Sequence, residues 1–137
     1  MNTFLLEIVT PERLVFSKQV SSLTVRGAEG EMGILPGHIP LVTPLQVAPL
    51  SVKADGVTIT IAVHGGFVEV RKDKVTILAE SAELPVDIDI ERAEAAKERA
   101  ERRLKSVNKQ DAIDHRRAEL ALQRAVTRIK VSGGKGQ

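Results

Sequence analysis

Two hydrophobic periodicities divide the chain near Pro85. In the N-terminal part, apolar and polar residues alternate in short runs, most clearly at Val57–Ile61, and this alternation is typical of strands with one buried and one wet face. Beyond Pro85, glycine and proline are absent until Gly133, and alanine, glutamate, arginine and lysine recur at helical spacing. We therefore predict two domains, covering residues 1–84 and 85–137.

The N-terminal domain is predicted to be a sandwich or barrel of short strands. Its strand-like runs are rich in valine, isoleucine and threonine. Turn-forming residues at Asp55-Gly56 and at 71–74 follow two of these runs, and many short strands at such spacing are typical of an all-β fold. The predicted strands are Phe4–Thr10, Val20–Arg26, Gln46–Val52, Val57–Val63, Phe67–Arg71 and Val75–Ala79.

The C-terminal domain is predicted to be a hairpin of two helices. Aspartates that precede each helical run can accept hydrogen bonds from the free N–H groups of the first turn. A short polar segment separates the two runs, and the glycine-rich end of the chain is predicted to be disordered. The predicted elements are a first helix from Asp87 or Asp89 to about Leu104, a connection at Ser106–Gln110, a second helix from Asp111 to about Ile129, and a disordered tail from about Gly133.

The apolar stripes of the two predicted helices are thin. Alanine allows two helices to approach closely but buries little surface, so at about 25 cal/mol per Å² the pair gains little from packing. We therefore expect a hairpin of marginal stability that can open. The stripe residues are Ala93, Ala96, Ala100 and Leu104 on the first helix and Ala118, Leu122, Ala125 and Ile129 on the second.

The composition removes several classes of function. Only 2% of the 137 residues are aromatic and none is cysteine, which excludes disulfides, thiolate metal sites and a cysteine nucleophile and argues against base-stacking surfaces. No run approaches the roughly 18 apolar residues of a membrane span, and the first residues lack the pattern of a signal peptide. We expect a soluble chain with no direct membrane insertion.

The net charge of +2 conceals an uneven distribution. Residues 1–86 carry 7 basic and 9 acidic side chains, whereas residues 87–137 carry 13 basic and 9 acidic ones. The surplus positive charge therefore lies in the C-terminal third. A nucleic-acid partner is not favoured, because the strand-rich part is net negative and no aromatic residue lies beside the basic ones.

No set of residues predicts catalysis. The three histidines, His38, His64 and His115, lack metal-ligand spacing, and no combination of serine, histidine and acid stands out. The glycine motifs lack the spacing of a phosphate-binding P-loop. Turn or edge positions explain His38 and His64, which lie next to Gly37 and Gly65. We predict a non-enzymatic protein without a metal site.

Six arginines repeat one spacing on both helices. The separations are seven and then four residues, which places three arginines along one face of each helix. If the helices fold antiparallel with these faces together, the guanidinium groups repel each other unless an anion such as a polyphosphate neutralises them. A solvated helix face with intrahelical pairs such as Glu98 with Arg102 explains the same pattern. The arginines are Arg92, Arg99 and Arg103, and Arg117, Arg124 and Arg128.

Two motifs of the N-terminal domain, Gly33–Leu41 (GILPGHIPL) and Gly65–Val70 (GGFVEV), form a distinctive pair. The opening Val9-Thr10-Pro11, the run Val75–Ala79 and the alanine-rich helices accompany them in a matching order. Over about residues 4–130 the chain resembles the epsilon subunit family of bacterial F-type rotary ATP synthases. The resemblance implies an N-terminal ten-stranded β-sandwich followed by a C-terminal antiparallel two-helix hairpin.

The resemblance also implies a role and a set of partners. Members of the family are non-catalytic rotor subunits that couple the gamma subunit to the c-ring, at the cytoplasmic face of the cell membrane. Their hairpin either folds against the sandwich, which permits turnover, or extends toward the alpha/beta catalytic head, which opposes ATP hydrolysis. By the same resemblance Glu31, Met32, Gly33 and His38 would form a loop that faces the c-ring. A purely structural Gly-Pro turn explains these residues equally well.

ATP-binding members of the family carry a short signature at the start of the first helix. Ile88–Ala93 satisfies each fixed position of that signature, and Glu83 precedes it at the family's distance. The resemblance therefore implies ATP as a regulatory ligand of the folded hairpin, with or without Mg²⁺, and no catalytic cofactor. Asp89 has a plainer explanation as a helix cap. The implied set is Glu83, Ile88 and Asp89 for the adenine and for local backbone positioning, Arg92, Arg99, Arg124 and Arg128 for the phosphates, Ala93 within the signature, and Arg103 and Arg117 as secondary candidates.

Two other interpretations of the sequence stay open. The same rotor subunit can carry a purely structural hairpin with no physiological ATP binding. An unrelated basic adaptor would instead bind polynucleotides, with a steep dependence on salt concentration.

Overall fold

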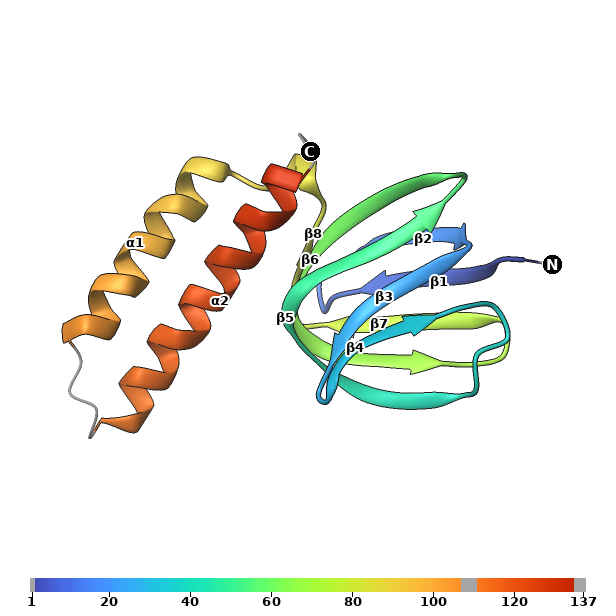
Figure 1. Ribbon diagram of the computed structural model, residues 1–137, viewed down its shortest axis with the longest axis horizontal. Coiled ribbons are helices and arrows are strands. Elements are labelled where there is room, and N and C mark those ends of the chain that lie inside the picture. Colours follow the sequence, from blue (N-terminus) through green and yellow to red (C-terminus); the bar gives the residue numbers. More distant parts are fainter. Residues whose placement is uncertain (1, 107–110, 135–137) are drawn as a thin grey trace.

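The computed structural model describes residues 2–106 and 111–134 of the chain. A domain of strands is followed by two helices that lie beside it (Figure 1). The strands are β1 (Phe4–Val9), β2 (Leu14–Val20), β3 (Ser22–Gly27), β4 (Gly30–Ile34), β5 (Leu41–Ala54), β6 (Val57–Val70), β7 (Lys74–Ala79) and β8 (Ala82–Glu83). The helices are the short 3-10 helix η1 (Pro85–Asp87), α1 (Ile90–Ser106) and α2 (Ala112–Gly134).

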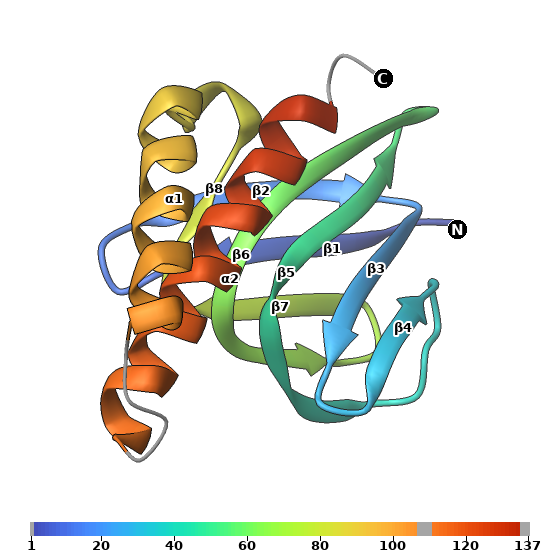
Figure 2. The same cartoon turned by 60° about the vertical axis from the view of Figure 1, so that its left-hand side comes forward.

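One continuous sheet folds back on itself to make the sandwich. Its strand order is β2-β1-β7-β6-β5-β3-β4, and β8 pairs with β6. The long strands β5 and β6 have 14 residues each and pair along nearly their whole length, and Figure 2 shows both curving from one layer into the other. Each long strand therefore contributes to both layers, which accounts for the difference between the eight strands described and the ten that the resemblance implies.

Aliphatic side chains fill the space between the layers. Alternate residues of β1 and β7 point inward, so that Leu6, Ile8, Val75 and Ile77 are at most 2% exposed. Of the three phenylalanines only Phe4 is fully buried, and the core is built from valine, leucine and isoleucine, as the composition predicts. Each such side chain stabilises the sandwich by about 1.5–3 kcal/mol when fully buried.

The strand boundaries differ from the predicted ones. The sequence pattern misses β2 and β4, and it predicts a break where β6 continues through Gly65-Gly66. These two glycines have φ angles of +81° and +124°, and pairing with β5 and β7 carries the strand across them. His64, predicted at a turn or edge, therefore lies inside a strand.

Both predicted turns of the sandwich are confirmed. Asp55 and Gly56 have φ angles of +53° and +77°, the backbone of a two-residue type I′ turn that joins β5 to β6. The Arg71 N–H donates to the Lys74 carbonyl over 2.8 Å and closes the turn between β6 and β7.

Helix α2 lies between α1 and the sandwich. It packs against β5 and β6 on one side and against α1 on the other, as Figure 2 shows. The first turn of α1 is capped by Asp89, whose Oδ1 accepts from the Arg92 N–H at 3.1 Å. In α2, Asp111 Oδ1 accepts from the Asp114 N–H at 3.2 Å. Both helices thus have a predicted cap, with Asp89 rather than Asp87 on the first.

Helix α2 is longer than predicted. It runs past Ile129 to Gly134, so the prediction that disorder begins at Gly133 is wrong for its first two residues. The physical reason is tertiary contact, because Val131 and Ser132 are at most 3% exposed. Residues 107–110 of the predicted connection and residues 135–137 of the predicted tail lie outside the described residues.

The alanine stripes lie where the helical spacing places them. Ala93 and Ala100 of α1 and Ala118 and Ala125 of α2 are at most 4% exposed. Because α1 packs mainly on α2, it is held to the molecule through this small-residue seam. None of the described helices is long and apolar enough to span a bilayer.

Candidate functional site

A cleft of about 420 Å³ lies between the first half of α1 and the last half of α2. This volume is within the roughly 300–1,000 Å³ of small-molecule sites. Three arginines and three carboxylates converge on it, and six of the predicted site residues are among its walls. The lining consists of Glu83, Asp87, Asp89, Arg92, Ala93, Ala96, Arg99 and Arg128.

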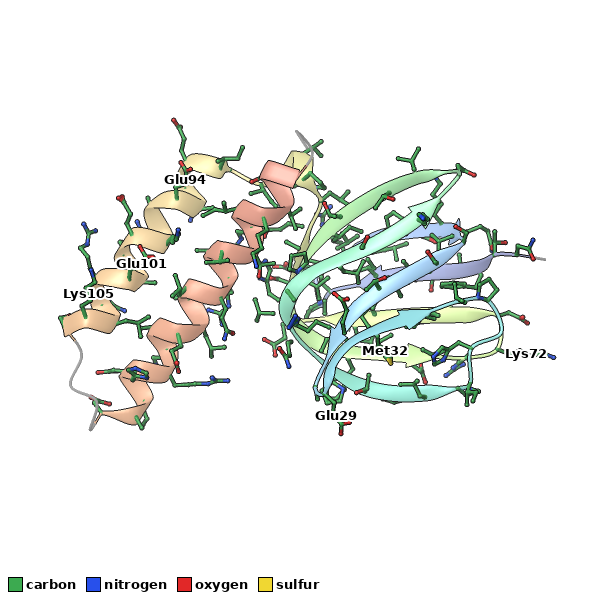
Figure 3. The ribbon with its side chains drawn as sticks, viewed as in Figure 1. Glu29, Met32, Lys72, Glu94, Glu101 and Lys105 are labelled. Carbon is green, nitrogen blue, oxygen red and sulfur yellow. The ribbon has the colours of Figure 1, made fainter. Side chains whose placement is uncertain are left out.

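The α1 side of this cleft is positively charged. Arg92 and Arg99 are exposed, and neither has an ion-pair partner among the described residues. Asp89, which also lines the cleft, caps the positive end of the α1 dipole. The alternative pairing of Glu98 with Arg102 is not formed. The labelled acids of α1 in Figure 3, Glu94 and Glu101, do not line the cleft.

Glu83 closes the cleft and joins three elements. From β8, its Oε1 accepts from His64 Nε2 of β6 at 3.0 Å and from Arg128 Nε of α2 at 2.6 Å. Burial raises the pKa of the Glu83 carboxyl, but the hydrogen bonds and charges of Arg128 and His64 outweigh burial and hold that pKa below its usual value. The carboxylate is therefore ionised at neutral pH and acts only as an acceptor.

His64 is a buried neighbour of Glu83 that sequence reasoning misplaces. It is only 3% exposed, and its Nδ1 is buried without a hydrogen-bond partner among the described residues. Burial lowers the pKa of His64; the hydrogen bond to Glu83 opposes this effect, and the positive charges of Arg128 and Arg124 reinforce it. The available signal in the sequence is the apolar run Ile61–Val63, which leads directly into His64 as a buried strand would.

The predicted arginines do not all reach one cleft. Arg103 and Arg117 line a separate hollow of about 410 Å³ at the other end of the hairpin. Arg124 lines a third hollow, on the sandwich side of α2 beside His64 and Gly65. The antiparallel order explains this division, because the start of α1 lies opposite the end of α2, and α2 has neighbours on two sides.

Ile88, predicted to serve the adenine or the local backbone, does not place its side chain in the cleft. Its side chain is 8% exposed and belongs to a buried cluster with Ala62 of β6 and Val131 of α2. It does not line the cleft. The structure therefore places Ile88 in the contact that anchors the hairpin to the sandwich.

The four residues predicted to face the c-ring do not form one loop. Glu31, Met32 and Gly33 lie in β4 and pair with β3, so the loop prediction is wrong for these three. Alternate residues of a strand point to opposite sides: Glu31 lines a hollow against α2, whereas Met32 packs against the sandwich core (Figure 3). Of the four, His38 alone lies in a turn, which Gly37 forms with a φ of +80°, and its side chain is half-buried.

A larger hollow of about 620 Å³ lies between α2 and strands β3 and β5. Its walls are mostly uncharged, and its charged members Arg26, Glu31 and Lys130 have mixed signs. It lacks the converging cations of the smaller cleft. Charge complementarity to a ligand therefore favours the cleft between the helices.

The cleft is chemically suited to binding. Arg92, Arg99 and Arg128 present N–H donors in the fork geometry that matches phosphate oxygens. Glu83 presents carboxylate acceptors at the same cleft. Among residues 2–106 and 111–134, no group of three histidine, cysteine or acidic side chains is placed to hold a metal ion. The arrangement matches a ligand with an anionic end and an N–H donor end.

Solved structures with the same architecture define the class of the fold. The chain aligns over its whole length with 83% of a chain in the Euglena gracilis mitochondrial ATP synthase, OSCP/F1/c-ring, with a TM-score of 0.80 and 25% identity. It also aligns over 90% of its length with 96% of a chain in the Tetrahymena thermophila mitochondrial ATP synthase central stalk/c-ring, with a TM-score of 0.55. That second match, at 15% identity, shows the fold alone. A sandwich with a docked helical hairpin is therefore a fold of ATP synthase assemblies.

Sequence comparison identifies the family. Residues 3–85 match the β-sandwich domain of the ATP synthase delta/epsilon chain, and residues 87–133 match its long alpha-helix domain. The ATP synthase epsilon chain of Brevibacillus brevis is 59% identical over 76% of this chain and 80% of its own length. That of Halalkalibacterium halodurans is 54% identical over 81% and 84%. The chain belongs to the ATP synthase delta/epsilon chain family, and is thus a non-catalytic subunit of the central stalk.

Proposed function

We propose that this chain is a rotor subunit whose folded helical hairpin binds ATP as a regulatory ligand. The observation that carries the proposal is the convergence of Arg92 and Arg99 from α1 with Arg128 from α2 on one cleft. The triphosphate would neutralise these cations, and Glu83 would accept from the adenine amino group. Mg²⁺ would travel on the phosphates, since the described residues offer no metal cluster.

ATP would select the folded position of the hairpin. Because the arginines come from both helices, the complete set exists only while the hairpin is closed, so the ligand binds that form preferentially. Without the ligand, the like charges and the thin alanine seam favour opening. A change from 1:99 to 99:1 requires a bias of about 5.5 kcal/mol. The open hairpin would extend toward the alpha/beta catalytic head and oppose ATP hydrolysis.

Titration calorimetry of the full chain tests the ATP proposal. We expect ATP to bind more tightly than ADP, which offers the arginines one phosphate fewer, and more tightly than GTP, which presents a carbonyl where adenine presents an amino group. Arg99→Gln should weaken ATP binding about tenfold or more, because a charge-assisted contact is lost. Arg102→Gln, on the same helix but outside the cleft, is the matched control.

Equal ATP affinities for the wild type and Arg99→Gln would contradict this proposal, as would equal affinities for ATP and GTP. The hairpin would then be a structural element of the same stalk subunit.

The proposed rotor partners are the gamma subunit and the c-ring, which would hold the chain peripherally at the cytoplasmic face of the membrane. The connection between β4 and β5 lies on the side of the sandwich away from the helices (Figure 1). Beside His38 it exposes Leu35 and Ile39, which are 62% and 77% exposed, and Val42 at the start of β5 is 65% exposed. Exposed apolar groups gathered in this way mark a protein contact, and we assign this one to the c-ring.

A second apolar surface lies on the outer face of the sheet. Phe67 of β6 pairs directly with Leu78 of β7, and each is 51% exposed. Pro44 of β5 lies opposite Phe67 on the other side, and Val9 of β1 lies opposite Leu78. This row crosses four neighbouring strands, and we assign it to the gamma subunit.

Ile39→Asp is expected to weaken capture of the c-ring about tenfold or more, because it puts a charge at the most exposed apolar side chain of that surface. Co-purification of gamma and the c-ring with the tagged chain measures the effect. Val57→Asp changes an apolar side chain of similar exposure, 59%, at the distant turn between β5 and β6, and should leave capture intact. Equal losses for the two variants would count against the assigned surface.

A further inference from the structure

Within residues 2–106 and 111–134, a single polar contact ties the helical hairpin to the sandwich. Among the residues that the structure describes, Arg128 with Glu83 is the one ion pair between α1 or α2 and a strand. The neighbouring contact of Ala62, Ile88 and Val131 is apolar. The Glu83 carboxylate therefore supplies a directional contact that adds to the packing of α2 on β5 and β6.

His64 holds this carboxylate from the sandwich side. Because an ionised carboxylate only accepts hydrogen bonds, the proton of the neutral ring must be on Nε2, which lies 3.0 Å from Glu83 Oε1. Nδ1 is then a bare acceptor, buried with no donor among the described residues. A second proton would enter at Nδ1, where the described residues provide no acceptor for it.

The charged groups around His64 come from three parts of the fold, and α2 covers the ring. Arg116 and Arg124 of α2 line the hollow beside His64, and the charges of Arg128 and Arg124 disfavour a positive charge on the ring. The β5 residue opposite His64 is the uncharged Val47. The charged groups are Glu83 of β8, Arg116, Arg124 and Arg128 of α2, and Glu80 of the turn after β7.

We propose that His64 is a positioning residue of the cleft, which holds Glu83 against Arg128 and makes both the docking of α2 and the nucleotide affinity decrease as the pH is lowered. His64 does not line the cleft itself and acts through Glu83. The nucleotide part of this inference rests on the proposed function, whereas the docking part is measurable without any ligand.

The sign of the pH dependence follows from the two positions of the hairpin. While α2 is docked, burial, together with the charges of Arg128 and Arg124, keeps the pKa of His64 below 6.5. When α2 leaves, it takes the cover and both arginines with it, so the pKa of His64 returns toward its ordinary value. The released form therefore binds more protons. The contribution of His64 to docking is complete above about pH 6.5 and is lost as the pH falls toward the pKa of the docked state.

Two substitutions of His64 distinguish a role in positioning Glu83 from a role in packing alone. His64→Gln keeps an amide N–H near the place of Nε2 but cannot be protonated, so docking and ATP affinity at pH 8 should be retained while the histidine-dependent pH response disappears. His64→Leu fills the same space but has no hydrogen-bond donor. It should weaken the docking of α2 and the ATP affinity about tenfold each at pH 8. His38→Gln removes a half-buried histidine of the connection between β4 and β5, far from α2, and serves as the matched control.

The experiment has a ligand-free arm and a nucleotide arm, both on the full chain between pH 8 and 5.5. In the first, NMR reports the tautomer of His64, and the methyl resonances of Ala62 and Val131 report docking of α2. In the second, calorimetry gives the ATP affinity of the wild type and of His64→Gln at each pH. Protonation of ATP itself is common to both proteins, so it cancels in their affinity ratio. We expect the ratio of wild-type to variant ATP affinity to decrease as the pH is lowered from 8 to 5.5.

Identical pH profiles for the wild type and His64→Gln would overturn the proposal, and so would an Nδ1–H tautomer of His64. Equal losses with His64→Gln and His64→Leu at pH 8 would also overturn it, because they indicate a packing role. If ATP fails to bind at pH 8 while ligand-free docking follows the expected profile, the proposed nucleotide function fails and the positioning role of His64 in docking stands.

Discussion

Replacing Gly66 with alanine is expected to prevent the sandwich from folding. Gly66 has a φ of +124° and pairs with Leu45 of β5 and Ala79 of β7. A Cβ at this position would collide with the carbonyl oxygen of Leu78 and come within 2.8 Å of the Ala79 Cα. Both are backbone atoms of a paired strand, so they cannot move without breaking the sheet. The expected loss of unfolding free energy exceeds about 4 kcal/mol, a large part of the total for such a domain.

Gly33→Ala is the matched control for this prediction. Gly33 also lies in a strand, but nothing is within 4 Å of the Cβ that alanine would add, and its φ is not positive. Its change in stability should stay within about 0.5 kcal/mol. Denaturant unfolding of the soluble chains measures both variants. A midpoint for Gly66→Ala close to that of Gly33→Ala would show that β6 and β7 can separate at this point without loss of the fold.

The strand that contains Gly66 also shows what local sequence patterns leave undetermined. Alternation identifies Val57–Val63 and Phe67–Arg71, yet Gly65-Gly66 carries the signal of a turn. Strand β6 continues through these glycines because it pairs with β5 and β7. That pairing joins residues far apart in the sequence, so a local pattern does not reveal it. The same error misplaced His64, because its partner Glu83 lies 19 residues away along the chain.

The helical hairpin was more predictable than the edge strands, for a physical reason. Caps such as Asp89 and Asp111 act within three residues, and the alanine stripes follow from helical geometry alone. Strands β2 and β4 lie at the ends of the sheet order, where much of each strand stays exposed. Alternation is weak in such strands, so their sequences give little signal.

The candidate site was predictable only within each helix. The spacing of seven and four shows which arginines share a face of one helix, but which of them meet depends on how the helices pair and dock. Arg92 and Arg99 meet Arg128 in the cleft, whereas Arg124, one turn from Arg128, lines the hollow on the sandwich side. Docking of α2 on β5 and β6 decides this, and docking is not encoded in the arginine spacing.

Replacing Ala125 with glutamate is expected to release the hairpin while the sandwich stays folded. Ala125 is 0% exposed midway along α2, which is packed between α1 and strands β5 and β6. A glutamate there must bury its carboxylate or take up a proton, at a cost of about 3 kcal/mol or more. The buried cluster of the sandwich contains no residue of α1 or α2, so its packing does not depend on the hairpin.

The release of the hairpin should remove both its helicity and its ligand. Helices of 17 and 23 residues with thin apolar stripes are marginal in water on their own, so circular dichroism should lose most of the helical signal while hydrogen exchange in the strands stays slow. ATP binding should disappear with it, because Arg128 no longer lies opposite Arg92 and Arg99. Gln123→Glu adds the same charge at an exposed position of α2 and should preserve both signals. If Ala125→Glu also preserves them, the alanine seam is not what brings the arginines together, and regulation by two hairpin positions loses its physical basis.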